Sequence, residues 1–202
     1  MTISMSDIIC ITARKLCGGD FIEQLEKIVK AAPKYIILRE KDLDEAEYRA
    51  LAQKAIEICS NSDTKLVLHY FWKTAIELGA DSIHLPLHLL RELSAEEKSR
   101  FGLIGASCHS AEDAVEAEKL GATYITAGHV FATDCKKGLP PRGLDFLREV
   151  CQSVDIPVYA IGGITPENYP QVIETGASGA CVMSGFMRCS EPKELMRKFY
   201  RK

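Results

Sequence analysis

The chain has 202 residues, 47% of them apolar, which suffices for the core of one domain and excludes a large multidomain enzyme. Charged residues make up 26%, and the net charge of -3 shows no basic excess, so we expect no binding to nucleic acid or to anionic lipid. No apolar run approaches the roughly eighteen residues of a membrane span. Because Met1 to Lys15 also lacks the pattern of a secretion signal, we expect a cytoplasmic protein.

Short blocks of branched aliphatic residues alternate with longer amphipathic stretches along the whole chain, which predicts alternating strands and helices. The predicted strands are Ile8 to Thr12, Tyr35 to Arg39, Lys65 to His69, Ser82 to Leu85, Leu103 to Ser107, Tyr124 to Gly128, Val158 to Ile161 and Gly179 to Met183. A helix is predicted after each strand, and the last helix spans Glu191 to Arg201.

Local signals mark the starts of two of these helices. Ser110-Ala-Glu-Asp113 is a capping box that leads into a helix from Ala114 to Leu120. Thr165-Pro-Glu-Asn168 predicts that Pro166 occupies the first turn of another helix.

Three glycines mark helix ends before the fourth, sixth and eighth strands: Gly79, Gly121 and Gly176. Eight strand-helix units in about 200 residues predict an α/β protein, a single-domain (β/α)8 TIM barrel over residues 1–202. A doubly wound open sheet is the alternative, but its glycine-rich phosphate turn should follow the first strand. The stretch from Ala13 to Gly19 lacks that spacing.

Eight cysteines are spread singly along the chain, without the close pairs of zinc sites or redox motifs. Cys10, Cys59, Cys151 and Cys181 lie in apolar stretches, where a thiol packs as a small hydrophobic group. We therefore expect a reducing compartment.

A TIM barrel carries its chemistry beyond the carboxyl ends of its strands, and the loops after strands seven and eight commonly bind phosphate. Here Ala160-Ile-Gly-Gly-Ile164 and Cys181-Val-Met-Ser-Gly185 end apolar strands with small residues that expose backbone amides. The expected phosphate-binding residues are Gly162, Gly163, Val182, Met183 and Ser184. Tight packing of the turns is the alternative explanation for the small residues.

The loop from Gly128 to Gly143 is long for a connection between a strand and a helix, and such loops are commonly functional. His129 directly follows a predicted strand, and an imidazole can accept or donate a proton near neutral pH. A structural, hydrogen-bonded histidine is the alternative. Cys135 has no base beside it in the sequence, so we do not expect it to be a nucleophile.

Six motifs, spread along the chain, carry a resemblance that extends over nearly its whole length. They are Leu38-Arg-Glu-Lys41, Gly79-Ala-Asp-Ser-Ile-His-Leu85, Ile104-Gly-Ala-Ser-Cys-His-Ser110, Gly128-His-Val-Phe-Ala-Thr-Asp-Cys-Lys-Lys-Gly138, Ala160-Ile-Gly-Gly-Ile164 and Val182-Met-Ser-Gly185. Together they resemble the thiamin phosphate synthase and thiazole tautomerase family. The resemblance implies a TIM barrel that binds a small-molecule thiazole phosphate, and barrels of this family are often homodimers.

The two branches of this family differ at identifiable residues. The synthase joins a pyrimidine methyl diphosphate to a thiazole phosphate, with Mg²⁺ held by carboxylates. Where synthases resemble Asn-Asp-Arg after the third strand, this sequence has His69-Tyr-Phe71, and where they place Gly-Gln and acidic residues after the fourth it has Pro86-Leu-His-Leu89. Ile37 replaces a glutamine of the synthase motif. We therefore expect no metal and no cofactor, with Mg²⁺ required only if the chain is a synthase.

The tautomerase branch is similar to the Gly128–Gly138 motif, in which His129 replaces a synthase proline. In that branch the corresponding histidine is implicated as the acid/base that converts an exocyclic thiazole carboxylate phosphate into its aromatic tautomer. The resemblance therefore predicts an isomerase, a thiazole tautomerase with His129 as the catalytic residue. The alternatives are the synthase, a transferase, and a non-catalytic regulator that binds a phosphorylated metabolite.

The resemblance also assigns residues to the substrate. We expect Ser107, Phe131, Thr133 and Lys136 to shape the carboxylate end of the pocket. Arg39 and Lys41 either bind a substrate phosphate or line the mouth of the barrel. His84, His88 and His109 are expected to be hydrogen-bonded groups, because no histidine and carboxylate set has the spacing of a metal site.

Overall fold

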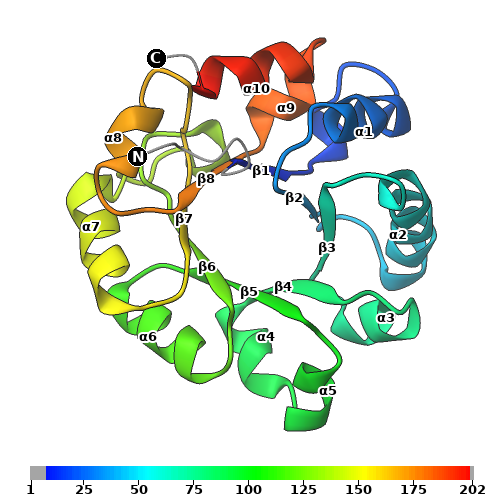
Figure 1. Cartoon of the computed structure of the whole chain (residues 1–202), viewed down its shortest axis with the longest axis horizontal. Coiled ribbons are helices and arrows are strands. Elements are labelled where there is room, and N and C mark those ends of the chain that lie inside the picture. The colour runs from blue at the N-terminus through cyan, green and yellow to red at the C-terminus, as the bar shows by residue number, and fades with distance from the viewer. Residues whose placement is uncertain (1–7, 201–202) are drawn as a thin grey trace.

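The computed structural model describes residues 8–200. Eight parallel strands close into a barrel in the order β1 to β8, with the helices around its outside, which confirms the predicted TIM barrel (Figure 1). The strands are β1 (Ile8–Ile11), β2 (Tyr35–Leu38), β3 (Lys65–His69), β4 (Ser82–Pro86), β5 (Leu103–Cys108), β6 (Tyr124–Gly128), β7 (Val158–Ile161) and β8 (Gly179–Val182). Each predicted strand end lies within about one residue of the observed end, because a strand buried on both faces forms a short apolar block with clear limits.

At least one helix follows every strand. The α-helices are α1 (Phe21–Lys30), α2 (Glu45–Cys59), α3 (Trp72–Glu77), α4 (Leu87–Glu92), α5 (Ala95–Ser99), α6 (Ala111–Lys119), α7 (Gly143–Ser153), α8 (Tyr169–Ile173), α9 (Ser184–Arg188) and α10 (Pro192–Tyr200). Two short 3₁₀ helices are η1 (Arg14–Leu16) and η2 (Asp134–Lys136). The predicted end of the last helix, Arg201, lies outside the described residues. No helix within residues 8–200 has the length and apolarity needed to cross a membrane.

The first helix-start signal is correct in kind but displaced. Ser110 caps α6, because its Oγ accepts a hydrogen bond from the Asp113 amide at 3.0 Å. The Asp113 carboxylate accepts from the His109 amide instead of the Ser110 amide, so the capping box is not reciprocal. The helix therefore begins at Ala111, three residues before the predicted start at Ala114.

The second helix-start prediction is wrong. Pro166 lies in a turn, and α8 begins at Tyr169. The side chain of Asn168 holds this turn, since its Oδ1 accepts from the Thr165 amide at 2.9 Å and its Nδ2 donates to the Gly163 carbonyl at 2.9 Å. An asparagine that bonds its own local backbone delays the helix.

The glycine signals before β4, β6 and β8 are confirmed. Gly79, Gly121 and Gly176 have φ values of 69°, 94° and 97°, a conformation that favours glycine. Each one ends a helix and turns the chain toward the next strand.

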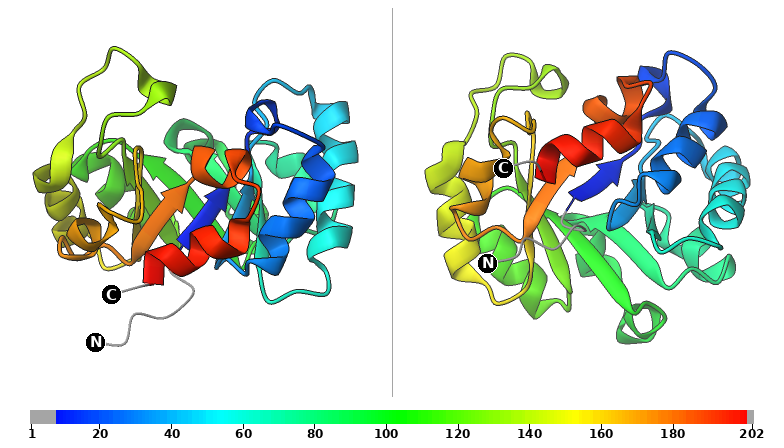
Figure 2. Two further views of the ribbon diagram at one scale, coloured as in Figure 1. Left: turned by 90° about the horizontal axis from the view of Figure 1, so that it is seen from above. Right: turned by 45° about the horizontal axis from the view of Figure 1, so that its top comes forward.

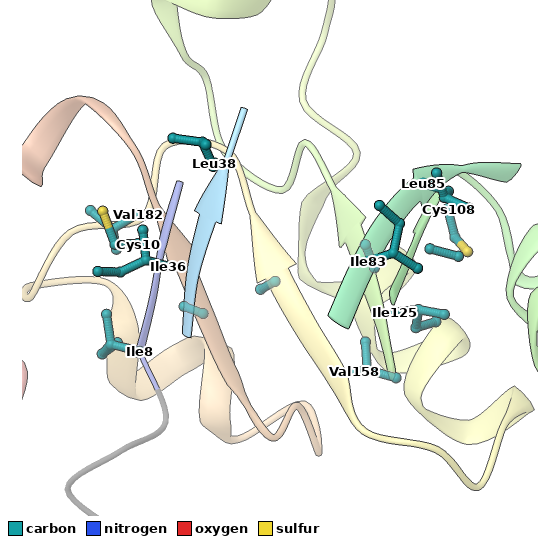
Figure 3. Close-up of a cluster of buried hydrophobic side chains, with 14 of the residues drawn as sticks. Ile8, Cys10, Ile36, Leu38, Ile83, Leu85, Cys108, Ile125, Val158 and Val182 are labelled. Carbon is teal, nitrogen blue, oxygen red and sulfur yellow. The ribbon is translucent and has the colours of Figure 1, made fainter. Parts of the chain in front are cut away.

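Strand residues alternate between two apolar cores. Ile8 and Cys10 of β1 belong to the larger core between the barrel and its helices (Figure 3). Ile9 and Ile11 belong to a smaller core inside the barrel. This division follows from the two-residue period of a strand, and it decides which residues can reach a ligand inside the barrel.

The cysteines behave largely as predicted. Cys10, Cys59 and Cys181 are buried, whereas Cys151 is half-buried. All eight cysteines lie within the described residues and are free thiols.

Aromatic side chains fill the amino end of the barrel. The rings of Tyr35, Tyr124 and Tyr159 lie 5.6 to 6.4 Å apart between centroids. Lys34 adds a hydrogen bond from its Nζ to the Tyr159 hydroxyl at 2.7 Å. Because this end is packed, a ligand enters from the carboxyl ends of the strands.

Candidate active site

A cavity of about 330 Å³ lies at the carboxyl end of the barrel. All eight strands, or the loops that follow them, contribute lining residues. The loop between β6 and α7, yellow-green in Figure 2, extends beyond the barrel on the side toward which the strand arrows point. The cavity therefore lies where a TIM barrel places its reactive groups.

The cavity brings together all but one of the residues expected to form the site. The lining includes Arg39, Lys41, Ser107, His129, Thr133, Lys136, Gly162, Gly163, Val182, Met183 and Ser184. Phe131 is not part of the lining, because its side chain packs against the larger core. Its amide donates to the Gly162 carbonyl at 3.0 Å, which links Phe131 to the loop after β7.

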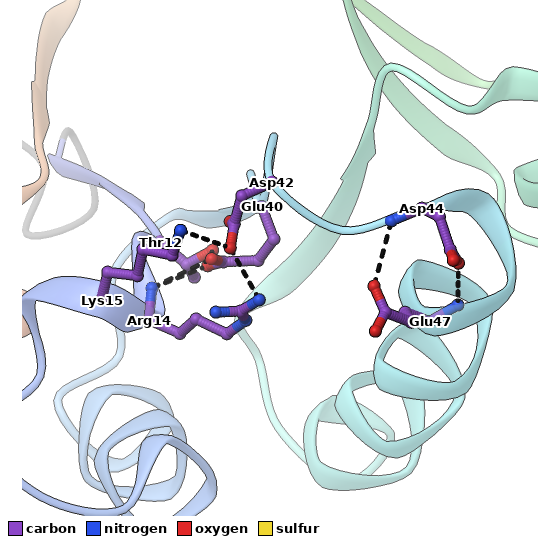
Figure 4. A network of polar contacts seen from close by, with 7 residues as sticks. All are labelled: Thr12, Arg14, Lys15, Glu40, Asp42, Asp44 and Glu47. Atoms are coloured by element: carbon purple, nitrogen blue, oxygen red, sulfur yellow. Dashed lines mark hydrogen bonds and ion pairs between the residues drawn. The ribbon is translucent and has the colours of Figure 1, made fainter.

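Buried polar contacts hold the backbone that carries Arg39 and Lys41 (Figure 4). The Thr12 hydroxyl donates to the Glu40 carboxylate at 2.6 Å and accepts from the Arg39 amide at 2.9 Å. The Arg14 amide donates to both Glu40 oxygens, at 3.0 and 3.1 Å. Burial raises the pKa of Glu40, although these hydrogen bonds oppose the effect. Glu40 therefore fixes the loop, with its carboxylate turned toward Thr12 and Arg14.

Three cations gather at the mouth of the cavity: Arg39, Lys41 and Lys136. Burial lowers the pKa of Lys41, and the charges of Arg39 and Lys136 lower it further. Arg39 and Lys41 follow β2, whereas Lys136 lies in the loop after β6, on the opposite side of the barrel. Because Lys41 and Lys136 line the same cavity, the two opposite sides of the barrel contribute cations to one site. A cluster of like charges favours an anionic ligand.

Two histidines lie side by side on the inner wall. His69 and His84 are buried, with ring centroids 6.0 Å apart. Burial lowers the pKa of His84 to about 3, and burial together with His84, Arg39 and Lys41 lowers that of His69. Both rings are therefore neutral near pH 7, and they serve as hydrogen-bonding groups instead of charges.

His84 has partners for both of its ring nitrogens. Nδ1 lies 3.0 Å from the Tyr124 hydroxyl, and Nε2 lies 2.9 Å from Oγ of Ser107, which lines the cavity. A neutral imidazole donates from one nitrogen and accepts at the other, so each hydroxyl takes the complementary role. This chain of contacts orients Ser107, and it confirms that His84 is a hydrogen-bonded group.

The other predicted histidines differ in their environments. His109 lines the cavity, and its Nδ1 lies 3.0 Å from the Gly128 carbonyl, so Nδ1 carries the proton. His129 is half-buried and lines the cavity, with Nε2 at 3.5 Å from the Leu139 carbonyl across the same loop. His88 is exposed on α4 and is not part of the lining.

Gly162 and Gly163 lie where the loops after β6 and β7 meet. The Val130 amide donates to the Ile161 carbonyl at 2.9 Å, which joins the two loops. A side chain at Gly162 would collide with His129, and a Cβ at Gly163 would lie 2.5 Å from the Ala132 carbonyl oxygen. Tight packing thus explains the two glycines, and because both also line the cavity, phosphate binding there stays a prediction.

Sequence reasoning missed several lining residues, among them Thr126 and Cys181. Both belong to strands whose alternate residues enter the barrel, as do His69 and His84. Two-residue alternation could have identified them, because the residue two positions away from an inward-facing strand residue also faces inward. Most of the predicted site residues lie in the loops after the strands.

The donor atoms around the cavity do not suit a divalent cation held by the protein. Mg²⁺ prefers carboxylate and other oxygen ligands. No Asp or Glu lines the cavity. Within residues 8–200, no group of three or more His, Cys, Asp or Glu side chains is placed to hold a metal ion.

Comparison with known proteins decides the family. The family model described as thiamine monophosphate synthase matches residues 8–186. The chain belongs to the thiamine monophosphate synthase family. The putative thiamine-phosphate synthase 2 of Aquifex aeolicus is 37% identical over 88% of this chain and 95% of that protein. The thiamine-phosphate synthase of Syntrophomonas wolfei is 36% identical over 93% of this chain and 91% of that protein.

A solved structure agrees with this assignment. Thiamine phosphate pyrophosphorylase from Pyrococcus furiosus superposes with a TM-score of 0.82 at 28% identity, covering 96% of this chain and 94% of that one. The resemblance to a family of thiamin biosynthetic enzymes is therefore confirmed.

The prediction of a thiazole tautomerase, an isomerase, is wrong. The curated relatives and the similar structure are thiamine-phosphate synthases or a pyrophosphorylase, which supports the transferase alternative. The prediction gave decisive weight to His129. An imidazole on a cavity wall can bind a ligand as readily as it can transfer a proton, so this one replacement did not identify the reaction.

Proposed function

We propose that this protein is a thiamine-phosphate synthase, a transferase that joins a pyrimidine methyl diphosphate to a thiazole phosphate. The observation that carries the proposal is the cavity itself, which combines the cluster of Arg39, Lys41 and Lys136 with a separate wall of small residues after β7 and β8. Two anionic groups can be bound in one space. Membership of the synthase family supports the same reaction.

The reaction conserves its atoms without a proton transfer. The bond between the methylene carbon of the pyrimidine and the diphosphate oxygen breaks, and the electron pair leaves with the diphosphate. The lone pair of the thiazole ring nitrogen forms the new carbon–nitrogen bond. The products are thiamine phosphate and inorganic diphosphate.

The cation cluster is suited to the leaving group. As the carbon–oxygen bond breaks, negative charge grows on the diphosphate, and Arg39, Lys41 and Lys136 face that charge. Stabilising charge that develops in the transition state is a large source of rate. The Thr12–Glu40 contacts keep the loop of Arg39 and Lys41 in place before the substrate arrives.

Another part of the cavity wall would hold the thiazole. Gly162, Gly163 and the segment from Val182 to Ser184 would bind its phosphate through backbone groups, and Ser107, His129 and Thr133 would contact the rings. Anchoring the phosphate fixes the ring nitrogen against the methylene carbon, and such positioning replaces a bimolecular encounter.

The test is a coupled measurement of both products. Purified protein is mixed with the pyrimidine diphosphate and the thiazole phosphate, and thiamine phosphate and inorganic diphosphate are quantified. We expect equal amounts of the two, and none when either substrate is left out. Release of diphosphate without thiamine phosphate, or no product with both substrates, would contradict the proposal.

The Lys136→Met and Lys137→Met variants locate the activity. Lys136 lines the cavity, whereas Lys137 is its exposed neighbour outside the lining. We expect the first variant to lose at least tenfold in kcat/KM and the second to stay within twofold, because a hydrogen bond to a charged group contributes about 1.5–3 kcal/mol.

A further inference from the structure

We propose that the residues of this cavity do not fit a divalent cation, and that the diphosphate faced by Arg39, Lys41 and Lys136 leaves without one. This inference rests on the proposed function. It follows from a mismatch between the donor atoms of the cavity and the needs of Mg²⁺, and from the cations that lie in the same place.

The first observation concerns two positions of the cavity wall at the ends of the neighbouring strands β3 and β4. His69 at the end of β3 and Pro86 at the end of β4 both line the cavity. The His69 ring lies 6.0 Å from the His84 ring, and the charges of Arg39 and Lys41 contribute to lowering the pKa of His69. A neutral imidazole and a proline ring present no carboxylate oxygen, so this wall offers hydrogen bonding but no hard anionic ligand.

The second observation concerns the carboxylates on the loop of Arg39 and Lys41. Glu40 is 3% exposed and bonds to the Thr12 hydroxyl and the Arg14 amide. Asp42 forms ion pairs with Arg14 at 2.7 Å and Lys15 at 3.0 Å. Both carboxylates form hydrogen bonds or ion pairs with residues that follow β1 (Figure 4), and neither lines the cavity.

The third observation is the charge balance at the mouth. Arg39, Lys41 and Lys136 line one cavity that contains no acidic side chain to neutralise them. A divalent cation placed among them would be repelled by three positive charges. A diphosphate carries about three negative charges near neutral pH, so it matches the cluster without help, and Arg and Lys bind phosphate oxygens through charge-assisted hydrogen bonds.

The substrate could bring Mg²⁺ with it, because this ion is often bound by substrate phosphates and only one or two carboxylates. In this cavity such an ion would have water and substrate as ligands and no acidic side chain. It would also compete with three cations for the same phosphate oxygens. The structure therefore predicts that Mg²⁺ gives no gain in affinity.

Binding of inorganic pyrophosphate tests the cluster apart from catalysis. Isothermal titration is carried out on chelator-treated protein, in EDTA and in excess Mg²⁺. We expect binding in EDTA that Mg²⁺ leaves unchanged or weakens, and a loss of about tenfold to a hundredfold in Lys41→Met and Lys136→Met. The Lys137→Met variant should match the wild type. Binding that requires Mg²⁺, or that the two cavity variants retain in full, would overturn the proposal.

Synthesis of thiamine phosphate under the same two conditions tests the catalytic half. We expect a rate in EDTA within about twofold of the rate in Mg²⁺. A fall of more than a hundredfold in EDTA would overturn metal-independent transfer while leaving the synthase function intact. Absence of product in both conditions would instead contradict the synthase function, and the pyrophosphate titration would then decide whether the cluster binds a diphosphate without metal.

Discussion

Gly105 occupies a position where no side chain fits. It lies on β5 beside the contact between His84 and Tyr124, and a Cβ there would overlap both side chains. Replacement by alanine must displace a buried histidine or a buried tyrosine, and overpacking of a core generally costs 1–3 kcal/mol. We expect Gly105→Ala to lose about 3 kcal/mol in the free energy of unfolding, measured by urea denaturation.

Gly102 supplies the matched control for this prediction. It lies three residues earlier, and the nearest atom to its added Cβ would be the Asp81 carbonyl oxygen at 3.9 Å. We expect Gly102→Ala to change stability by less than about 0.5 kcal/mol. Equal losses in the two variants would show that the crowding around His84 and Tyr124 is not what makes Gly105 necessary.

Glu40 gives the stability of the protein a pH dependence of defined sign. Burial raises the pKa of this carboxyl in the folded state, so between its ordinary value of 4.5 and the folded value the native chain binds more protons than the unfolded chain. The contribution of Glu40 to stability is therefore complete below pH 4.5 and declines as the pH rises through the folded pKa. A glutamine side chain does not ionise, so its contribution to stability at this position does not change with pH.

The comparison of wild type with Glu40→Gln isolates this effect from the other carboxyls. We expect the free energy of unfolding of the wild type, minus that of the variant, to decrease between about pH 4 and pH 7. Urea titrations at several pH values measure it. A difference that grows with pH would mean that the hydrogen bonds from Thr12 and Arg14 outweigh burial at this site.

At the scale of elements, the contact between the β6–α7 and β7–α8 loops positions Lys136. Gly163 has a φ of 67°, and a Cβ there would lie 2.5 Å from the Ala132 carbonyl oxygen and 2.8 Å from Cβ of Phe131. Gly163→Ala must push the long loop away from β7. We expect at least a tenfold higher KM for the pyrimidine diphosphate, measured by steady-state kinetics.

Gly121→Ala separates this displacement from backbone strain. Gly121 has a φ of 94°, and its added Cβ would meet no atom within 4 Å. Alanine at a positive φ costs about 1–2 kcal/mol, so both variants should lose stability. Gly121→Ala should keep the wild-type KM, and an equally unchanged KM in Gly163→Ala would disprove the link between the two loops and the site.

The sequence predicted the strands well because a strand buried on both faces forms a short, nearly continuous apolar block. It predicted the helix ends at Gly79, Gly121 and Gly176 because a positive φ at the end of a helix favours glycine. Helix starts were less predictable. Asn168 forms hydrogen bonds with local backbone groups and delays the start of α8. The backbone groups can be satisfied either by these bonds or by a longer helix, and hydrophobic periodicity does not distinguish the two.

Most of the predicted site residues line one cavity, but the sequence did not identify the reaction. Strand ends of a TIM barrel must converge, so Arg39, Lys136 and Gly163 could be placed on one cavity from sequence. The meaning of His129 could not be fixed, because its chemistry depends on which ligand lies beside it. Lys41 and Lys136 belong to loops far apart in sequence, and that both line one cavity becomes visible only when the barrel closes.

For the whole molecule, net charge and local charge have opposite signs. The chain carries a net charge of -3, yet the mouth of its cavity presents three cations and no acid. Anionic substrates are attracted by the local field despite the overall charge, and salt screens that attraction over about 10 Å at 0.1 M. We expect kcat/KM to fall about threefold to tenfold when potassium chloride rises from roughly 10 to 300 mM.

Two variants that remove the same charge identify its source. Lys41→Met removes a cation of the cluster, whereas Arg148→Met removes an exposed cation of α7 that pairs with Asp145. Both give the same net charge, so a field set by the whole molecule would change the salt dependence equally in each. We expect only Lys41→Met to flatten the plot of kcat/KM against ionic strength, because the field that attracts a diphosphate arises at the mouth of the barrel.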